Sequence, residues 1–188
     1  MRKRFQLIVL ALLSSLAGFA QIDARYGVGA VPVVNNHVTF EKTIPIPAGQ
    51  NEEWAYKKVV KWVEGRFVEP TVLSSKIIEL DDTNNHLILQ AEEYLTFKRN
   101  WIVLDRTRIK YLLEVMPADG GMLVRMTRIR YWYDEERGGG QHFTAEEWIT
   151  DEQCFNKSKT KFLRATGKFR IKTIDLFDQL TKELKNSL

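Results

Sequence analysis

The chain has 188 residues, of which 44% are hydrophobic and 28% charged, a size and composition that suit one domain with its own core. Its 28 Lys and Arg residues outnumber 24 Asp and Glu residues, for a formal charge of +4, but Arg2, Lys3 and Arg4 precede every acidic residue. Without these three the charge is +1. That balance lacks the positive excess by which proteins neutralise nucleic-acid phosphates, so we expect no nucleic-acid partner.

The first 20 residues have the pattern of a secretory signal peptide. A basic start is followed by an apolar run over residues 5–16 and by small residues in Gly18-Phe19-Ala20. We predict cleavage after Ala20 and export to the periplasm or beyond. The apolar run is shorter than the roughly 20 residues of a bilayer-crossing helix, so an uncleaved anchor is the weaker alternative and we expect no transmembrane segment in the mature chain. No cysteine stands at the predicted cleavage site, and we expect no lipid anchor.

Residues 21–32 contain three turn-forming residues and no hydrophobic periodicity, so we expect a flexible lead-in there and a single domain over residues 33–188. From Val38 apolar residues alternate with polar ones as in a half-buried strand, and Pro45 and Pro47 indicate a sheet edge. Asn51 is a typical helix cap. A broad apolar stripe at helical spacing follows it and predicts a helix up to about Phe67.

A series of antiparallel strands is predicted next. Residues 75–80 and 86–91 flank a strong turn signal, residues 94–104 are β-prone with a turn expected at 98–100, and residues 107–115 alternate cleanly. A turn over residues 117–121 leads to a partner strand over 122–133, and three glycines at 138–140 predict a mobile loop. Residues 144–150 fit either a final strand or one helical turn.

The C-terminal tail has the apolar spacing of an amphipathic helix, with Phe169, Thr173, Leu176, Phe177 and Leu180 on one face. The order is therefore strand, helix, several antiparallel strands and helix. This order predicts an α+β domain in which one antiparallel sheet carries two helices on one face. The other face of the sheet would then meet solvent or a partner.

That other face provides the first predicted binding surface. Its members share one face on each of two successive strands: Arg106, Arg108 and Lys110 on one, and Arg128, Arg130 and Trp132 on the next. Arginine and tryptophan are enriched where proteins bind one another, so these positions could form a basic, aromatic interface. A solvated sheet face with cation–aromatic packing is the alternative.

A second predicted binding surface is basic and precedes the tail helix. No acidic residue separates its seven members: Lys157, Lys159, Lys161, Arg164, Lys168, Arg170 and Lys172. Such a segment could bind anionic lipid headgroups, a polyanionic glycan or an acidic protein. A solvated face balanced by acids elsewhere is the alternative.

No catalytic or metal-binding pattern stands out, and we expect no cofactor or metal. His37, His86 and His142 lie in separate turn-like segments without metal-ligand spacing, and adjacent acidic residues point to opposite faces of a strand. Cys154, the single cysteine, could act as a nucleophile with His142 as its base, but burial as a small apolar residue is the better interpretation.

Four segments resemble an uncharacterised, exported bacterial family, a domain of unknown function with a TBP-like fold. They are residues 38–44, 56–62, 145–151 and 169–175. The resemblance implies a curved antiparallel sheet with two helices on one side, and it implies no activity. The likeness to the TATA-binding protein concerns the fold alone, and a fold does not transfer a function.

These observations favour an exported, non-enzymatic binding domain that uses the open sheet face or the basic segment over residues 157–172. Its partner would be an unknown protein or an anionic component of the cell envelope. A hydrolase whose site is assembled from distant residues and a glycan-associated protein of the envelope surface are the alternatives.

Overall fold

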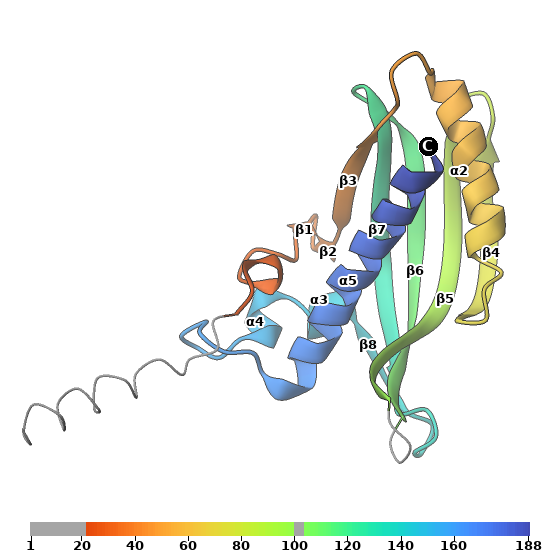
Figure 1. Cartoon of the computed structure of the whole chain (residues 1–188). Helices are drawn as coiled ribbons and strands as arrows, with labels where there is room; N and C mark the ends of the chain where they lie inside the picture. The colour runs from red at the N-terminus through yellow and green to blue at the C-terminus, as the bar shows by residue number, and fades with distance from the viewer. Residues whose placement is uncertain (1–21, 100–103) are drawn as a thin grey trace, which may run out of the picture.

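The structure, a computed structural model, describes residues 22–99 and 104–188, so the predicted signal peptide lies outside the described residues (Figure 1). After a short 3-10 turn, η2 (Ala24–Tyr26), most of the chain forms long strands and two long helices. The strands are β1 (Val33–Val34), β2 (His37–Val38), β3 (Phe40–Pro45), β4 (Val72–Asp81), β5 (His86–Arg99), β6 (Leu104–Ala118), β7 (Gly121–Tyr133) and β8 (Gln141–Thr144). The helices are α2 (Glu52–Arg66), α3 (Ala145–Trp148), α4 (Asp151–Cys154) and α5 (Arg164–Ser187).

One antiparallel sheet organises the domain. Its strand order is β3-β7-β6-β5-β4, and β8 pairs with the end of β7 beyond β3. Helices α2 and α5 both lie against the same face of this sheet (Figure 1). The predicted α+β class, with two helices on one face of a single sheet, is therefore confirmed. We call the face away from these helices the open face.

The alternation of side chains along the strands produces the two faces. On β6 the residues Thr107, Ile109, Tyr111, Leu113 and Val115 are buried, as the sequence predicts, while their neighbours are partly or fully exposed. The same alternation holds on β5 and, on either side of one irregularity, on β7, because successive side chains of a regular strand point to opposite faces. The helix-facing sides of three long strands therefore form one apolar floor.

Helix α5 covers this floor along its 24 residues. Near its start, the ring of Phe169 packs against Phe97, Tyr131, Tyr133 and Trp148, with ring centroids 4.6 to 5.8 Å apart. One turn later, the hydroxyl groups of Tyr131 and Thr173 are 2.7 Å apart and hydrogen-bonded in the core. The tail stripe predicted from the sequence is thus the buried face of α5.

Helix α2 begins at the predicted cap, where the Asn51 side chain accepts a hydrogen bond from the Trp54 backbone. At its other end Arg66 reaches into the core and donates to Glu93 at 2.8 Å, and Tyr111 donates to the same carboxylate. Burial and the charge of Glu93 both raise the pKa of Tyr111 well above its ordinary value. This buried polar cluster connects α2 to β5 and β6.

The segment expected to be a flexible lead-in is instead packed against α5. Arg170, which is fully buried, donates to the carbonyl oxygens of Tyr26, Gly27 and Ile149 and pairs with Asp151 at 2.8 Å. The guanidinium group therefore satisfies backbone acceptors of two segments that are far apart in the sequence. The interpretation as a flexible segment is wrong for Tyr26 and Gly27, and it stays a prediction for the rest of residues 21–32.

Other local expectations are refined by the structure. The turn expected at 117–121 is confined to residues 119 and 120, because both flanking strands extend into it. The ambiguous segment after β8 is a helical turn, α3, in which Thr144 and Glu147 form a reciprocal capping box. β5 continues to Arg99, so residues 98 and 99 of the expected turn belong to the strand, and residues 100–103 are outside the described part of the chain.

We expect Arg170→Met to lower the free energy of unfolding by about 3–5 kcal/mol, because it leaves the mostly buried Asp151 carboxylate and three carbonyl groups without their partner. Urea denaturation measures this loss. Arg164→Met, in the exposed first turn of the same helix, is the matched control and should change stability by no more than about 0.5 kcal/mol. Equal stabilities of the two variants would contradict the role assigned to Arg170.

Candidate functional site: the open face of the sheet

The strand register brings most of the predicted surface residues together on the open face. Arg108 lies opposite Trp132 and Lys110 lies opposite Arg130 on the paired strands β6 and β7. Arg106 lies two positions before Arg108 on β6, so its side chain points to the same face of the sheet. These residues alternate with the buried floor of the sheet, so the helices α2 and α5 do not cover them.

Arg128 departs from this row. A register shift between Lys110 and Leu112 marks a bulge, and Arg128 has a φ of 55°, outside the strand conformation. Its Nη1 atom lies 3.3 Å from Nε2 of His37, at the edge strand β2. The expectation that Arg128 continues the row of Arg130 and Trp132 is therefore wrong, because the bulge interrupts the alternation on which it rested.

Arginine side chains stack on aromatic rings in the centre of the open face. The guanidinium of Arg106 lies 3.8 Å from the centroid of the Tyr94 ring, and that of Arg108 lies 4.5 Å from the Trp132 ring. Arg108 also pairs with Glu135 and, at 3.5 Å, with Glu92. The surface therefore mixes charges. The sequence pattern missed these acidic partners because Glu135 lies beyond the end of β7 and Glu92 lies on the neighbouring strand β5.

A cleft of about 600 Å³ opens beside these stacked residues. Its lining combines charged groups with aromatic ones: Leu104, Asp105, Arg106, Arg108 and residues 132–137. The glycine loop contacts one of these lining residues, since Nε1 of Trp132 donates to the Gly139 carbonyl at 2.8 Å. Gly140 has a φ of +77°, and a Cβ atom there would lie 2.5 Å from Trp132 Nε1, so this position requires glycine.

Not every charge at this cleft is free to meet a ligand. Lys168 binds Asp105 at 2.8 Å and the Tyr133 hydroxyl at 2.9 Å, while Tyr94 donates to Glu135 at 3.1 Å. By contrast, Arg106, Lys110 and Arg130 have no ion pair with any residue in the described part of the chain. No carboxylate within residues 22–99 and 104–188 therefore neutralises these three cations of the open face.

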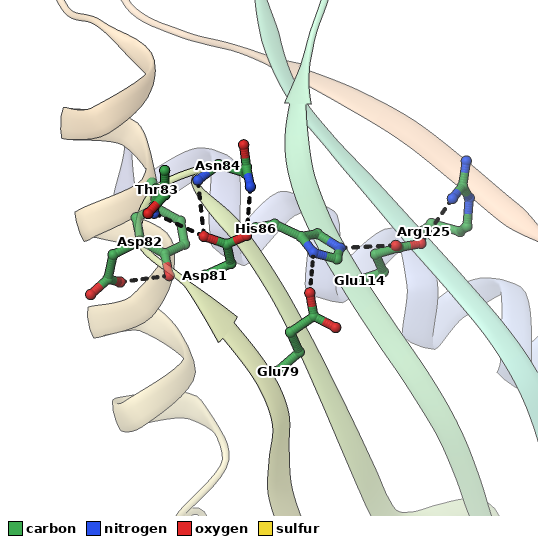
Figure 2. Close-up of polar contacts among 9 residues, drawn as sticks. Glu79, Asp81, Asp82, Thr83, Asn84, His86, Glu114 and Arg125 are labelled. Carbon is green, nitrogen blue, oxygen red and sulfur yellow. Dashed lines mark hydrogen bonds and ion pairs between the residues drawn. The ribbon is translucent and has the colours of Figure 1, made fainter.

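A row of alternating charges crosses all five main strands elsewhere on the open face. It runs from Glu79 on β4 through His86, Glu114 and Arg125 to Glu41 on β3, and Figure 2 shows its central contacts. The ring nitrogens of His86 lie 3.0 Å from Glu79 and 2.9 Å from Glu114, and Arg125 donates to Glu114 at 2.8 Å. We call this row the charged belt.

The belt changes the acid–base behaviour of His86. Partial burial is the largest single influence and disfavours the imidazolium, but the hydrogen bonds and charges of Glu114 and Glu79 together outweigh it and raise the pKa of His86 above its ordinary value. The sequence showed His86 only as a surface histidine in a turn. Its two partners, Glu79 and Glu114, lie on the neighbouring strands β4 and β6, where both side chains point to the open face.

The basic segment before α5 is dispersed by the fold. Lys157, Lys159 and Lys161 are exposed on a loop that the stacked rings of Phe155 and Phe162 close, with centroids 4.9 Å apart. Lys168 is engaged at the cleft and Arg170 is buried. These two residues therefore do not belong to an exposed basic surface over residues 157–172, whereas Arg164 is exposed and Lys172 is partly exposed.

The remaining chemistry-bearing residues have separate partners. Cys154 is buried, as expected, and donates to the Trp148 carbonyl, whereas His142 stacks on Trp132 with centroids 5.2 Å apart. Burial also raises the pKa of the Cys154 thiol, which disfavours the nucleophilic thiolate. Among residues 22–99 and 104–188 no three metal-binding side chains cluster, and no helix there is long and apolar enough to cross a membrane.

Together, the antiparallel sheet, its two helices on one face and its open opposite face define a TBP-like fold. The crystal structure of a TBP-like protein from Parabacteroides distasonis ATCC 8503 has this fold, with a TM-score of 0.66 at 17% identity over 84% of this chain and 96% of that one. None of the curated proteins matches this chain.

Two further matches show the family to which the chain belongs. The family model described as a domain of unknown function (DUF4468) with TBP-like fold matches residues 40–132. The crystal structure of a DUF4468 family protein from Bacteroides ovatus ATCC 8483 is 34% identical, with a TM-score of 0.77 over 88% of this chain and 94% of that chain. The chain belongs to the DUF4468 family, which confirms the resemblance found in the sequence.

We expect His86 to stabilise the fold in a pH-dependent way. Because its folded pKa is raised, the stabilisation is fully present below the unfolded value of about 6.5 and is lost as the pH rises through the folded value. Urea denaturation between about pH 5 and 9 should show that the free energy of unfolding of the wild type exceeds that of His86→Gln at low pH, and that this difference shrinks as the pH rises. His142→Gln is the control, since no described carboxylate binds His142. A pH-independent advantage would contradict the belt's role.

Proposed function

We propose that this chain is an exported, non-enzymatic binding domain whose open sheet face binds an anionic partner, either an acidic protein or an anionic component of the cell envelope. One observation carries the proposal: Arg106, Lys110 and Arg130 keep unneutralised charge on a face that the helices leave open. Neighbouring arginines of the same face are already paired with glutamates. The uncompensated cations are therefore the groups that a partner would complement.

The cleft supports the same surface. Its stacked arginine and aromatic side chains are held in place by their own contacts, so they would lose little conformational freedom on binding. The loop that carries Lys157 and Lys159 is the competing surface, because it too is exposed and basic. Binding there would give the envelope-surface, glycan-associated protein that the sequence leaves open.

Export is supported by the pattern of the first 20 residues. We expect mass spectrometry of the protein purified from the periplasm or culture medium of its host to find Gln21 as the first residue. Replacing Leu10 and Leu12 in the apolar run with arginine should retain the protein in the cytoplasm with its leader attached. An N-terminus at Met1 in wild-type protein would contradict the proposal.

The binding proposal is tested by comparing two sets of charge removals. Immobilised protein is incubated with extract of the cell envelope, and each captured species is quantified for wild type, for Arg106→Gln/Lys110→Gln/Arg130→Gln and for Lys157→Gln/Lys159→Gln/Lys161→Gln. We expect capture to fall about tenfold in the open-face variant, since three lost contacts of about 0.5 kcal/mol each amount to one power of ten. Capture should also fall with added salt.

The loop variant is the matched control, because it removes as many positive charges from another surface. It should capture the partner as wild type does. Loss of capture in the loop variant alone would assign binding to the basic loop. Capture of no species at any salt concentration would contradict a binding function.

A further inference from the structure

The outer strand β4 is an exposed, apolar sheet edge. Among the strands within residues 22–99 and 104–188 it pairs only with β5, and residues 73–80 are all exposed. Ile78 is 51% exposed, Leu80 48% and Ile77 39%, which is unusual for large apolar side chains on a strand that carries one free row of backbone hydrogen-bonding groups. Soluble proteins commonly protect such an edge, because it is a template for pairing with another strand.

A bulge gives this edge an ordered charge pattern. Lys76 pairs with Gln90 and Glu79 pairs with Ile88, with a register shift between Ile77 and Glu79. Gln90 and Ile88 both alternate with buried residues of β5, so Lys76 and Glu79 share the open face, although a regular strand would place them on opposite faces. The sequence Lys76-Ile77-Ile78-Glu79 thus carries one positive and one negative group on one face, around two apolar residues.

We propose that β4 pairs with β4 of a second copy of this chain, antiparallel and about a twofold axis between Ile77 and Ile78. In this register Lys76 lies opposite the partner's Glu79, Glu79 lies opposite the partner's Lys76, and Ile77 lies opposite the partner's Ile78. The segment is self-complementary because reversing its direction exchanges its two charges. A twofold axis then satisfies both charge pairs and both apolar pairs at once.

The same charges exclude the parallel, in-register alternative. That arrangement would place Lys76 against the partner's Lys76 and Glu79 against the partner's Glu79, and like charges directly opposite each other destabilise a strand pair. Lys76 has no ion pair with any residue of 22–99 or 104–188, so it is available to the partner. Glu79 uses Oε1 for His86, and its second carboxylate oxygen remains for the partner's Lys76.

The size of the contact sets the expected strength. A single pair of edge strands buries less surface than the roughly 1,200–2,000 Å² of a stable interface, so association should be weak and concentration-dependent. We expect sedimentation velocity of the purified protein, as its cell processes it, to show a monomer–dimer equilibrium with a Kd of about 1–100 µM. Ile78→Lys, at an exposed position that should not affect folding, abolishes the dimer. Val34→Lys, at an equally exposed valine on β1, retains it.

A charge exchange tests the register. Lys76→Glu and Glu79→Lys each replace two attractive contacts per dimer with two repulsive ones, so each single variant should self-associate at least about tenfold more weakly. Mixing these two variants should restore a dimer, now between unlike copies, and the double variant K76E/E79K should dimerise within about threefold of wild type. Circular dichroism confirms that each variant is folded.

Three outcomes would overturn the proposal. The wild-type protein could stay monomeric at all concentrations up to several hundred micromolar. The dimer could survive Ile78→Lys, which would place the contact on another surface. The mixed and double variants could associate as weakly as the single ones, which would exclude pairing of Lys76 with the partner's Glu79.

Discussion

The packing of α5 across the sheet is the contact on which the rest of the structure depends. Phe169 packs against aromatic rings from the two strands β5 and β7, and the hydrogen bond between Tyr131 and Thr173 fixes how far α5 lies along β7. Once this face of the sheet is buried, the two-residue period of a strand determines which side chains lie on the opposite, open face. Arg108 and Lys110 lie outside because Thr107, Ile109 and Tyr111 lie inside. The chemistry of the open face is therefore a consequence of the core.

The charged belt acts on register more than on stability. Partly exposed ion pairs each contribute at most about 1 kcal/mol, so Glu114 and Arg125 add little to the total. A slip of one residue between β6 and β7 would, however, break their pairing and bring buried side chains to the surface. The charged belt and the core therefore favour the same register of β6 and β7. In the centre of the open face the pairing is incomplete, because no described carboxylate forms an ion pair with Arg106, Lys110 or Arg130.

The features that could be predicted from the sequence are those whose interacting residues lie close together along the chain. The cap at Asn51, the alternation along β6 and the apolar face of α5 are local signals, and all three predictions are confirmed. The burial of Arg170 could not be predicted, because its acceptors are backbone carbonyls more than 20 residues away and a carbonyl leaves no mark in a sequence. The bulge at Arg128 was hidden for a similar reason, since only the register of two strands reveals it.

The two edges of the sheet are treated differently. At one edge β3 is short and ends at Pro45, which lacks the backbone donor that a further strand would need, and β8 occupies the rest of β7. At the other edge β4 is long, apolar and without proline. Lys76 and Glu79 share the open face, so a twofold contact through β4 would place both open faces on the same side. Two binding surfaces would then address one partner or one surface together. Such a pair gains apparent affinity from linkage, which suits individually weak contacts made by only a few free cations.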